Sequence, residues 1–387
     1  MKKTVLILLL FLPILSYSQE RKWNLDGYVK DLYMFYHPEQ PPIGPELPNY
    51  HLNTIHNRLN FNWYANEKIS FSMGMRNRLI MGNMVSEIPN YRATADVDNG
   101  YMDLSWISAY SDKWFLHSIV DRAYLDCTKG DWQFRIGRQR INWGISKVWN
   151  PNDVFNSFSY FDFDYEERPG SDAVNIRHYT GVTSSMELVF KMADHSSEMA
   201  LAAMYRFSKW NYDFQLLSGW VGDDYMAGGG WSGDIMGGGF RGEISYFRPR
   251  STNNNSKEAT VASLSYDYTL KNSLSLSIEG LFNSNGSTKN AVGSNVLFDQ
   301  NLSAKMLSRA KYSVFGQLAY PITPLFNASF STIFNPSDHS CYLNPSFSYS
   351  LSENIELMLT TQLFFGKNGS EFGDIGQVSF GRLRWSF

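Results

Sequence analysis

The chain has 387 residues with 34 basic and 37 acidic side chains, so its formal net charge is only −3. This balance excludes the basic excess that is typical of nucleic-acid-binding proteins. The chain also holds 27 Phe, 23 Tyr and 11 Trp, although its mean hydropathy is mildly polar. Strands that alternate apolar and polar residues in a transmembrane barrel reconcile these two properties. The alternative is a soluble β-sandwich or propeller.

The N-terminal residues predict an export signal. A basic start precedes an apolar run over Val5–Leu15, and small residues follow at Ser16 and Ser18, as in secretory signal peptides. We therefore expect a signal peptide over 1–18 and a single outer-membrane β-barrel domain over 19–387. Outside the signal, no apolar run reaches the roughly 18 residues of a membrane-spanning helix.

After the signal, apolar and polar residues alternate in segments of about ten residues. Within 273–282, Leu276 and Ile278 fall on one face and Ser277 falls on the other. The pattern predicts an all-β fold, a transmembrane antiparallel β-barrel of about 18 strands, with 16 as the alternative number. Segment 98–110 is assigned to a loop, because one more strand would make the number odd. The expected strands cover roughly 22–36, 52–65, 67–82, 113–127, 131–144, 172–181, 184–193, 197–207, 210–221, 225–235, 237–248, 258–268, 272–284, 306–319, 323–334, 339–350, 354–365 and 376–387.

The connections between these strands alternate between short turns and longer polar links. This layout is typical of bacterial barrels, which have short periplasmic turns and longer extracellular loops. We therefore expect the long links to face the cell exterior. They lie at about 37–51, 83–112, 145–172, 249–257, 285–305 and 366–375.

The segment over 131–144 departs from the simple pattern. Strict alternation would place Arg138 in lipid, at a cost of about 2–4 kcal/mol near the midplane. We therefore expect a β-bulge at Gly137 that turns the following polar residues into the lumen and leaves Ile141 and Trp143 outside. The candidate lumen residues are Arg122, Arg135, Arg138, Arg140 and Arg177. Arg58, Arg76, Arg78, Arg241, Arg382 and Arg384 also fall on inward registers.

The link over 145–172 is expected to fold into the barrel. Its prolines, Asn and Asp exclude a regular strand, and its many aromatics exclude a fully solvated loop. Opposed charges across a narrow lumen would form a constriction that sorts solutes by charge and shape. The alternative is that the acids only pin the loop to the wall. The acids expected at the constriction are Asp153, Asp162, Asp164, Glu166 and Glu167.

The last residues form an amphipathic strand. Leu383, Trp385 and Phe387 share one face, and Arg382 and Arg384 share the other. A C-terminal strand that ends in Phe resembles the closing strand of bacterial outer-membrane barrels, in which this end is the assembly signal. The resemblance implies partners: the lipid bilayer of the outer membrane, the barrel-assembly machinery through Phe387, and other outer-membrane subunits. No nucleic-acid partner is expected.

A family resemblance rests on three stretches between 137 and 170: Gly-Arg-Gln-Arg-Ile-Asn-Trp-Gly, Trp-Asn-Pro-Asn-Asp-Val-Phe-Asn and Asp-Tyr-Glu-Glu-Arg-Pro-Gly. They resemble porin-like outer-membrane proteins of gram-negative bacteria, in particular the 18-stranded alginate-export channels. The resemblance implies an arginine-rich conduit for a polyanion, with a loop folded over it. The Ser-Tyr-Ser-Gln end of the signal is similar to signals common in Bacteroidota.

Motifs for catalysis are missing from the sequence. It has no His-Glu-x-x-His, Cys-x-x-Cys or Gly-x-Ser-x-Gly element. Cys127 and Cys341 are interpreted as small apolar side chains on outward registers. We therefore expect no enzyme, cofactor or metal site. The expected function is a porin-like channel for passive passage of small polar or anionic solutes; the alternative is a closed structural barrel in an outer-membrane assembly or export complex.

Overall fold

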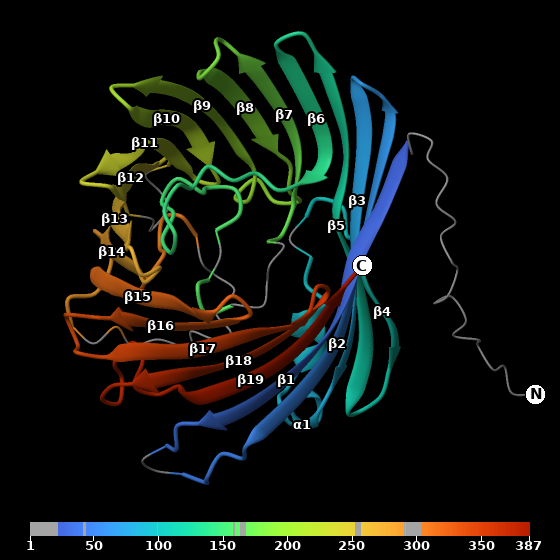
Figure 1. The fold of residues 1–387 in the computed structure, drawn as a ribbon, viewed down its shortest axis with the longest axis vertical. Helices are drawn as coiled ribbons and strands as arrows, with labels where there is room; N and C mark the ends of the chain where they lie inside the picture. Colours follow the sequence, from blue (N-terminus) through green and yellow to red (C-terminus); the bar gives the residue numbers. More distant parts are fainter. Residues whose placement is uncertain are drawn as a thin grey trace, which may run out of the picture.

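The wall of strands closes on itself, because β1 (Trp23–Pro38) pairs with β19 (Gly376–Ser386). The computed structural model describes residues 22–41, 44–98, 100–157, 159–162, 168–251, 257–289, 291 and 303–387. Within these residues the strands form one antiparallel sheet. Figure 1 shows a ring of strands around a segment that crosses its interior.

The other strands follow in chain order. They are β2 (Tyr50–Asn66), β3 (Ile69–Met81), β4 (Ser105–Tyr110), β5 (Trp114–Lys129), β6 (Trp132–Gln139), β7 (Ser171–Tyr179), β8 (Ser185–Lys191), β9 (Ala200–Lys209), β10 (Tyr212–Val221), β11 (Asp224–Ile235), β12 (Gly238–Pro249), β13 (Ala259–Thr269), β14 (Ser275–Asn283), β15 (Tyr312–Thr323), β16 (Phe326–Phe334), β17 (Cys341–Ser352) and β18 (Ile355–Phe365). Of these 19 described strands, β4 is not a full wall strand, because β3 pairs directly with β5 along its whole length. The remaining 18 form the closed barrel, which confirms the predicted fold and excludes the 16-strand alternative.

Alternate residues face outward and into the lumen along each strand. On β13, Leu264 faces outward and is half exposed, whereas Ser265 faces inward and is buried. Cys341 lies opposite Phe334 and Phe365, two exposed outward residues, in agreement with its predicted apolar position. The outward faces together form the apolar band that a barrel presents to a bilayer.

Two short helices lie between β3 and β5. They are α1 (Asn83–Glu87) and α2 (Tyr91–Ala95), and they pack against the inward residues Leu52, Ile80 and Phe115. Both helices therefore cover part of the lumen at the end of the wall where β3 finishes. Within the described residues, no helix has both the length and the apolar character needed to cross a bilayer.

One position in the wall is built from two separate pieces. The second half of β5, Ala123–Lys129, pairs with β6. Its first half, Phe115–Ile119, pairs with β4. β4 thus continues the wall where β6 ends at Gln139. Segment 98–110, which was expected to be all loop, supplies this strand. It adds no full-length strand, so the even number is kept.

The end of β6 corrects two expectations. The strand was predicted over 131–144, but it ends five residues earlier and Arg140 lies outside it. The predicted bulge at Gly137 is also wrong, since the pairing of β6 runs through Gly137 without a shift on both sides. The register shift lies instead between β3 and β5, where Asp121 is the extra residue.

Candidate functional site in the barrel lumen

The chain that leaves β6 turns into the lumen. Ile141 and Trp143, which were expected to face lipid, are 2% and 1% exposed and belong to a buried cluster inside the barrel. The Trp143 ring meets the Phe155 ring edge-on with centroids 4.8 Å apart. An alternating pattern in this segment therefore reflects burial in the lumen and not a strand. We call residues 140–162 the lumen loop.

Wall carboxylates hold the lumen loop. Glu243 on β12 accepts hydrogen bonds from the backbone N–H groups of Ile145, Ser146 and Asn152, the last two at 2.7 and 2.9 Å. Glu279 on β14 accepts from the N–H groups of Val148 and Trp149, at 3.2 and 2.7 Å. We had expected acids on the loop to meet arginines on the wall. In these described contacts the acids lie on the wall, and the loop supplies backbone N–H donors.

The far end of the lumen loop reaches the opposite wall. The Tyr160 hydroxyl donates to the Ser331 hydroxyl at 3.0 Å, and Gln362 donates to the carbonyl of Phe161 at 2.8 Å. The Phe161 ring also meets the Tyr342 ring edge-on with centroids 5.0 Å apart. The loop therefore crosses from β6 to β16–β18, as the green segment inside the ring of Figure 1 shows. The prediction of a long inward-folded loop is confirmed.

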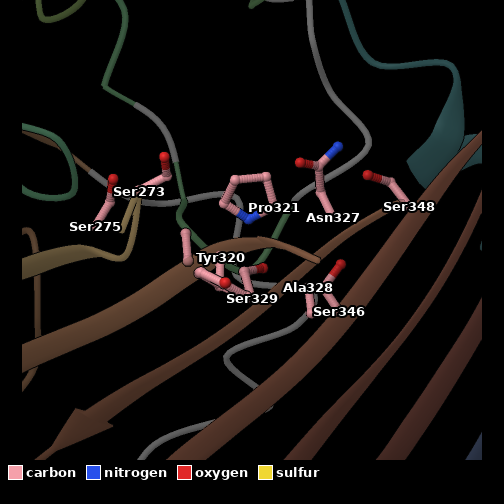
Figure 2. A pocket seen from close by; sticks show the side chains of 10 residues that line it. Ser273, Ser275, Tyr320, Pro321, Asn327, Ala328, Ser329, Ser346 and Ser348 are labelled. Carbon is pink, nitrogen blue, oxygen red and sulfur yellow. The ribbon is translucent and has the colours of Figure 1, made fainter. Parts of the chain in front are cut away.

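A neutral sector of the wall lies toward the ends of β14 to β17 that adjoin short turns. Ser275, Ala319, Ser329 and Ser346 are register partners across these four strands. They line a pocket of about 270 Å³ whose described lining has no charged side chain (Figure 2). This sector of the lumen offers hydroxyl and amide groups to a solute, but no charge.

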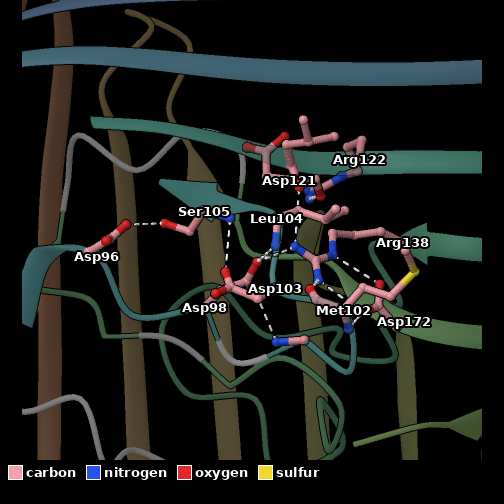
Figure 3. Close-up of polar contacts among 12 residues, drawn as sticks. Asp96, Asp98, Met102, Asp103, Leu104, Ser105, Asp121, Arg122, Arg138 and Asp172 are labelled. Carbon is pink, nitrogen blue, oxygen red and sulfur yellow. Dashed lines mark hydrogen bonds and ion pairs between the residues drawn. The ribbon is translucent and has the colours of Figure 1, made fainter. Parts of the chain in front are cut away.

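Arg138 clamps the junction between β4 and β6 (Figure 3). Its Nε and one Nη donate to Asp172 at 2.9 and 2.8 Å, and the other N–H groups go to Asp98, the Met102 carbonyl and the Val120 carbonyl. All five donors are occupied. The expectation that Arg138 meets segment 162–167 is therefore wrong. A side chain at Gly100 would collide with the Arg138 guanidinium, so glycine is needed there.

Three other predicted lumen arginines face inward and are engaged by neighbouring strands or segments. Arg135 pairs with Asp126 at 2.7 Å, and Arg177 pairs with Glu187 at 2.7 Å. Arg122 donates to its neighbour's carbonyl and to the carbonyl of Arg168. These contacts hold strands and the end of the link together. They do not bring the arginines to the described acids of the loop.

The predicted acids divide into three groups. Asp153 is buried, and burial raises the pKa of its carboxyl to about 7, although Arg140 and Arg168 nearby lower it. Asp162 is exposed at the end of the lumen loop. Asp164, Glu166 and Glu167 lie outside the described residues. Within the part of the chain that the structure describes, no three His, Cys, Asp or Glu side chains form a metal-binding group.

A group of basic residues lies on four adjacent strands of the wall. Arg384 on β19, Lys30 on β1, His56 on β2 and Arg78 on β3 are successive register partners. Arg58 and Arg76 are partners in a second row on β2 and β3. We call these residues, with Arg382, the basic face. Sequence periodicity had placed its arginines inward, but Lys30 and His56 were missed, because their place depends on the pairing of β1 with both β19 and β2.

Asp121 is one counter-charge of the basic face, and Glu356 on β18, which accepts a hydrogen bond from Arg382, is another. Its Oδ2 accepts from an Nη of Arg58 at 2.7 Å and lies 3.6 Å from Nε of Arg76. Gly74 makes this approach possible, since a Cβ there would lie 2.6 Å from the Arg58 guanidinium. The bulge residue of β5 thus places one carboxylate between two arginines that oppose each other across the strands.

These features define the class of protein: a β-barrel of the outer-membrane type with a loop folded into a charged lumen. No family model and no curated protein matches the sequence. Among solved structures, OccAB4 of Acinetobacter baumannii aligns with a TM-score of 0.62 at 10% identity, over 95% of this chain and 99% of that one.

Two further structures come from Pseudomonas aeruginosa. The outer membrane protein OprD aligns with a TM-score of 0.57 at 10% identity, over 94% of this chain and 95% of that one. OccD3 aligns with a TM-score of 0.56 at 8% identity, over 94% and 91%. At these identities the likeness establishes the fold alone. The chain therefore has the fold that these outer-membrane barrels share.

Proposed function

We propose that the protein is an outer-membrane channel for passive passage of small anionic or polar solutes. The basic face carries this proposal. Like charges placed directly opposite each other destabilise a sheet, yet Lys30 opposes Arg384 and Arg58 opposes Arg76. A row of cations along a lumen attracts anions and lowers the energy of their passage. The function therefore gives a reason for the gathering of these cations on one face of the lumen.

The solute path follows from the position of the lumen loop. The loop packs against strands from β10 to β18, and the basic face lies on β19 to β3. A solute would pass beside the cations on one side and the loop on the other. The expected roles of Arg135, Arg177 and the loop acids as selectivity residues remain predictions. The same holds for the resemblance to alginate-export channels.

A second candidate function is a closed structural barrel. The observation that favours it is the filled half of the lumen, where the loop is hydrogen-bonded to two walls at once. In this case the cations would serve only to hold segments inside the barrel. Purified protein in planar bilayers separates the two functions, because a closed barrel has no conductance at any voltage.

Ion selectivity then tests the role of the basic face. Replacement of Lys30 and Arg384 by Gln should lower the anion-to-cation permeability ratio, measured from reversal potentials in a KCl gradient. One unit charge at close range in water changes an ion's energy by about 1 kcal/mol, or roughly fivefold in the ratio. Arg248→Gln is the matched control, since Arg248 is an exposed residue at the end of β12. An unchanged ratio in the double variant would refute the proposal.

A further inference from the structure

The outer surface of β1 carries a carboxylate where lipid is expected. Asp31 is exposed, and its register partners are Leu383 on β19 and Ile55 on β2. These two neighbours are 47% and 41% exposed and face outward. Register partners in an antiparallel sheet share a face, so Asp31 also points away from the lumen. Among the described residues, no cation lies within ion-pair distance of its carboxylate.

Asp31 lies within the outward apolar band of the wall, two residues before the exposed, outward-facing Tyr33. Trp23 and Trp63 are outward register partners near the turn end of β1 and β2, and tryptophans of barrels mark the membrane interface. Asp31 is eight residues farther along β1. At about 3.3 Å per residue and a tilt of about 45°, this is roughly 19 Å along an apolar band about 25 Å tall.

A second polar feature lies beside it. Asn57 on β2, Asn77 on β3 and Ser118 on β5 are successive outward partners. The Ser118 hydroxyl donates to Asn77 at 2.7 Å, the Asn77 amide donates to Asn57 at 3.4 Å, and the Asn57 amide donates to the Tyr28 carbonyl at 3.4 Å. Each amide has two N–H groups and uses one in the described contacts, so each keeps a donor that lipid cannot satisfy.

This combination is local to one side of the barrel. On the far side, the outward row through Leu264, Gly280 and Val314 is apolar. Charged side chains in lipid are costly, and polar side chains at membrane depth serve as contacts between neighbouring proteins. The outer face of β1–β3 therefore has the chemistry of a protein interface inside the membrane. We call Asp31, Asn57 and Asn77 the outer polar patch.

We propose that a second copy of this chain covers the outer polar patch. The patch is self-complementary, because an acceptor lies on β1 and spare donors lie on β2 and β3. A two-fold axis along the membrane normal turns two such faces toward each other, so that the β1 side of each copy meets the β3 side of the other. Asp31 of each copy then accepts from the amides of the other, and Leu383 and Ile55 form the apolar rim.

Cross-linking in intact outer membranes tests the interface. In a background with Cys127→Ala and Cys341→Ala, the Asn57→Cys variant should oxidise to a species of twice the monomer mass. Ile278→Cys is the control, since Ile278 is an exposed outward residue on β14 and should give no such species. A cross-link to a protein of another mass, or no cross-link above the control, would overturn the proposal.

A second measurement guards against misfolding. Asp31→Leu with Asn77→Leu should reduce the dimer in native mass spectrometry at least tenfold, while heat-modifiable mobility shows that the barrel stays folded. If the patch faces lipid instead, the two leucines leave the mass unchanged. Neither readout depends on conductance, so the inference stands or falls separately from the proposed channel function.

Discussion

Asp121 sets the charge balance at the centre of the basic face. It is a buried acid among cations, and its position depends on a register shift of one residue in β5. Breaking a buried ion pair leaves an uncompensated charge, which costs about 3–5 kcal/mol. Arg58 and Arg76 therefore depend on this carboxylate to stay in the wall together.

Asp121→Asn keeps the shape of the side chain and removes its charge. If the basic face conducts anions, the anion-to-cation permeability ratio should rise by roughly fivefold for one unit charge. Arg58→Gln should lower the ratio, and the double variant should return it close to that of the native protein. Reversal potentials measure all three, after heat-modifiable mobility has confirmed folding. A double variant that keeps the ratio of either single variant would contradict direct pairing.

Asp153 gives the lumen loop a pH dependence. Its pKa is raised to about 7 in the folded protein, above the ordinary value of about 3.9. A raised carboxyl pKa stabilises the fold fully below the ordinary value, and this contribution is lost as the pH rises through the folded pKa. The protection of amides 145–157 against hydrogen exchange, taken relative to the intrinsic exchange rate at the same pH, should therefore be lower at pH 8 than at pH 5.

Asp153→Asn is the control for this effect. The facing groups Arg140, Arg168 and Glu243 are present in both proteins, so only the Asp153 carboxyl differs. The variant should lose most of the difference in protection between the two pH values. An equal difference in both proteins would assign the pH dependence to another group.

At the level of elements, alternation predicted the wall strands well and the end of β6 poorly. Arg140–Trp143 continues the polar–apolar pattern of the strand, because a loop that is buried on one side needs the same pattern as a strand. The sequence also could not identify the contacts of Glu243 and Glu279. Both residues fall on inward registers, as lumen residues should. Their carboxyl groups accept hydrogen bonds from backbone N–H groups, and the pattern of side chains does not indicate which backbone groups these are.

Glu243→Gln with Glu279→Gln should loosen the lumen loop. The two carboxyl groups accept five backbone hydrogen bonds, and a typical hydrogen bond contributes about 0.5–1.5 kcal/mol. We expect proteolysis within 145–157 to become faster and single-channel conductance to rise. Glu258→Gln, at an exposed site beside β13, should change neither. A conductance equal to that of the native protein would mean that the loop does not limit passage.

For the whole molecule, the sequence predicted the closed 18-strand barrel for two reasons. Alternation recurs in each wall strand, and an even number of strands brings both ends of the barrel to the same side. The inside of the barrel was predictable only in outline. Inward registers revealed where arginines point, but their partners come from strands and loops far away in the chain. Arg138 illustrates this, since Asp98 and Asp172 lie on either side of it in sequence and neither belongs to the acidic segment chosen from composition.

Phe387 completes the wall at the closing pair of strands. Its backbone exchanges two hydrogen bonds of 3.0 Å with Gly27 of β1, and its exposed ring lies beside that of Trp385. Phe387→Asp should place a charge at the membrane interface and reduce the amount of heat-modifiable folded barrel in the outer membrane. Phe387→Tyr is the conservative control and should retain it. Equal amounts of folded Asp and Tyr variants would exclude an assembly role for this ring.

The two-piece wall position has a consequence for the order of folding. β4 and β6 flank β5 in the sequence, and each forms a hairpin with it through a short turn. Contacts between residues close in the chain form faster than those that close long loops. β4, β5 and β6 can therefore assemble as a local three-stranded unit, in which Arg138 of β6 bonds to Asp98 and Met102 in the segment before β4. The β1–β19 pair joins the two ends of the domain, so it closes a long stretch of chain and is expected to form late.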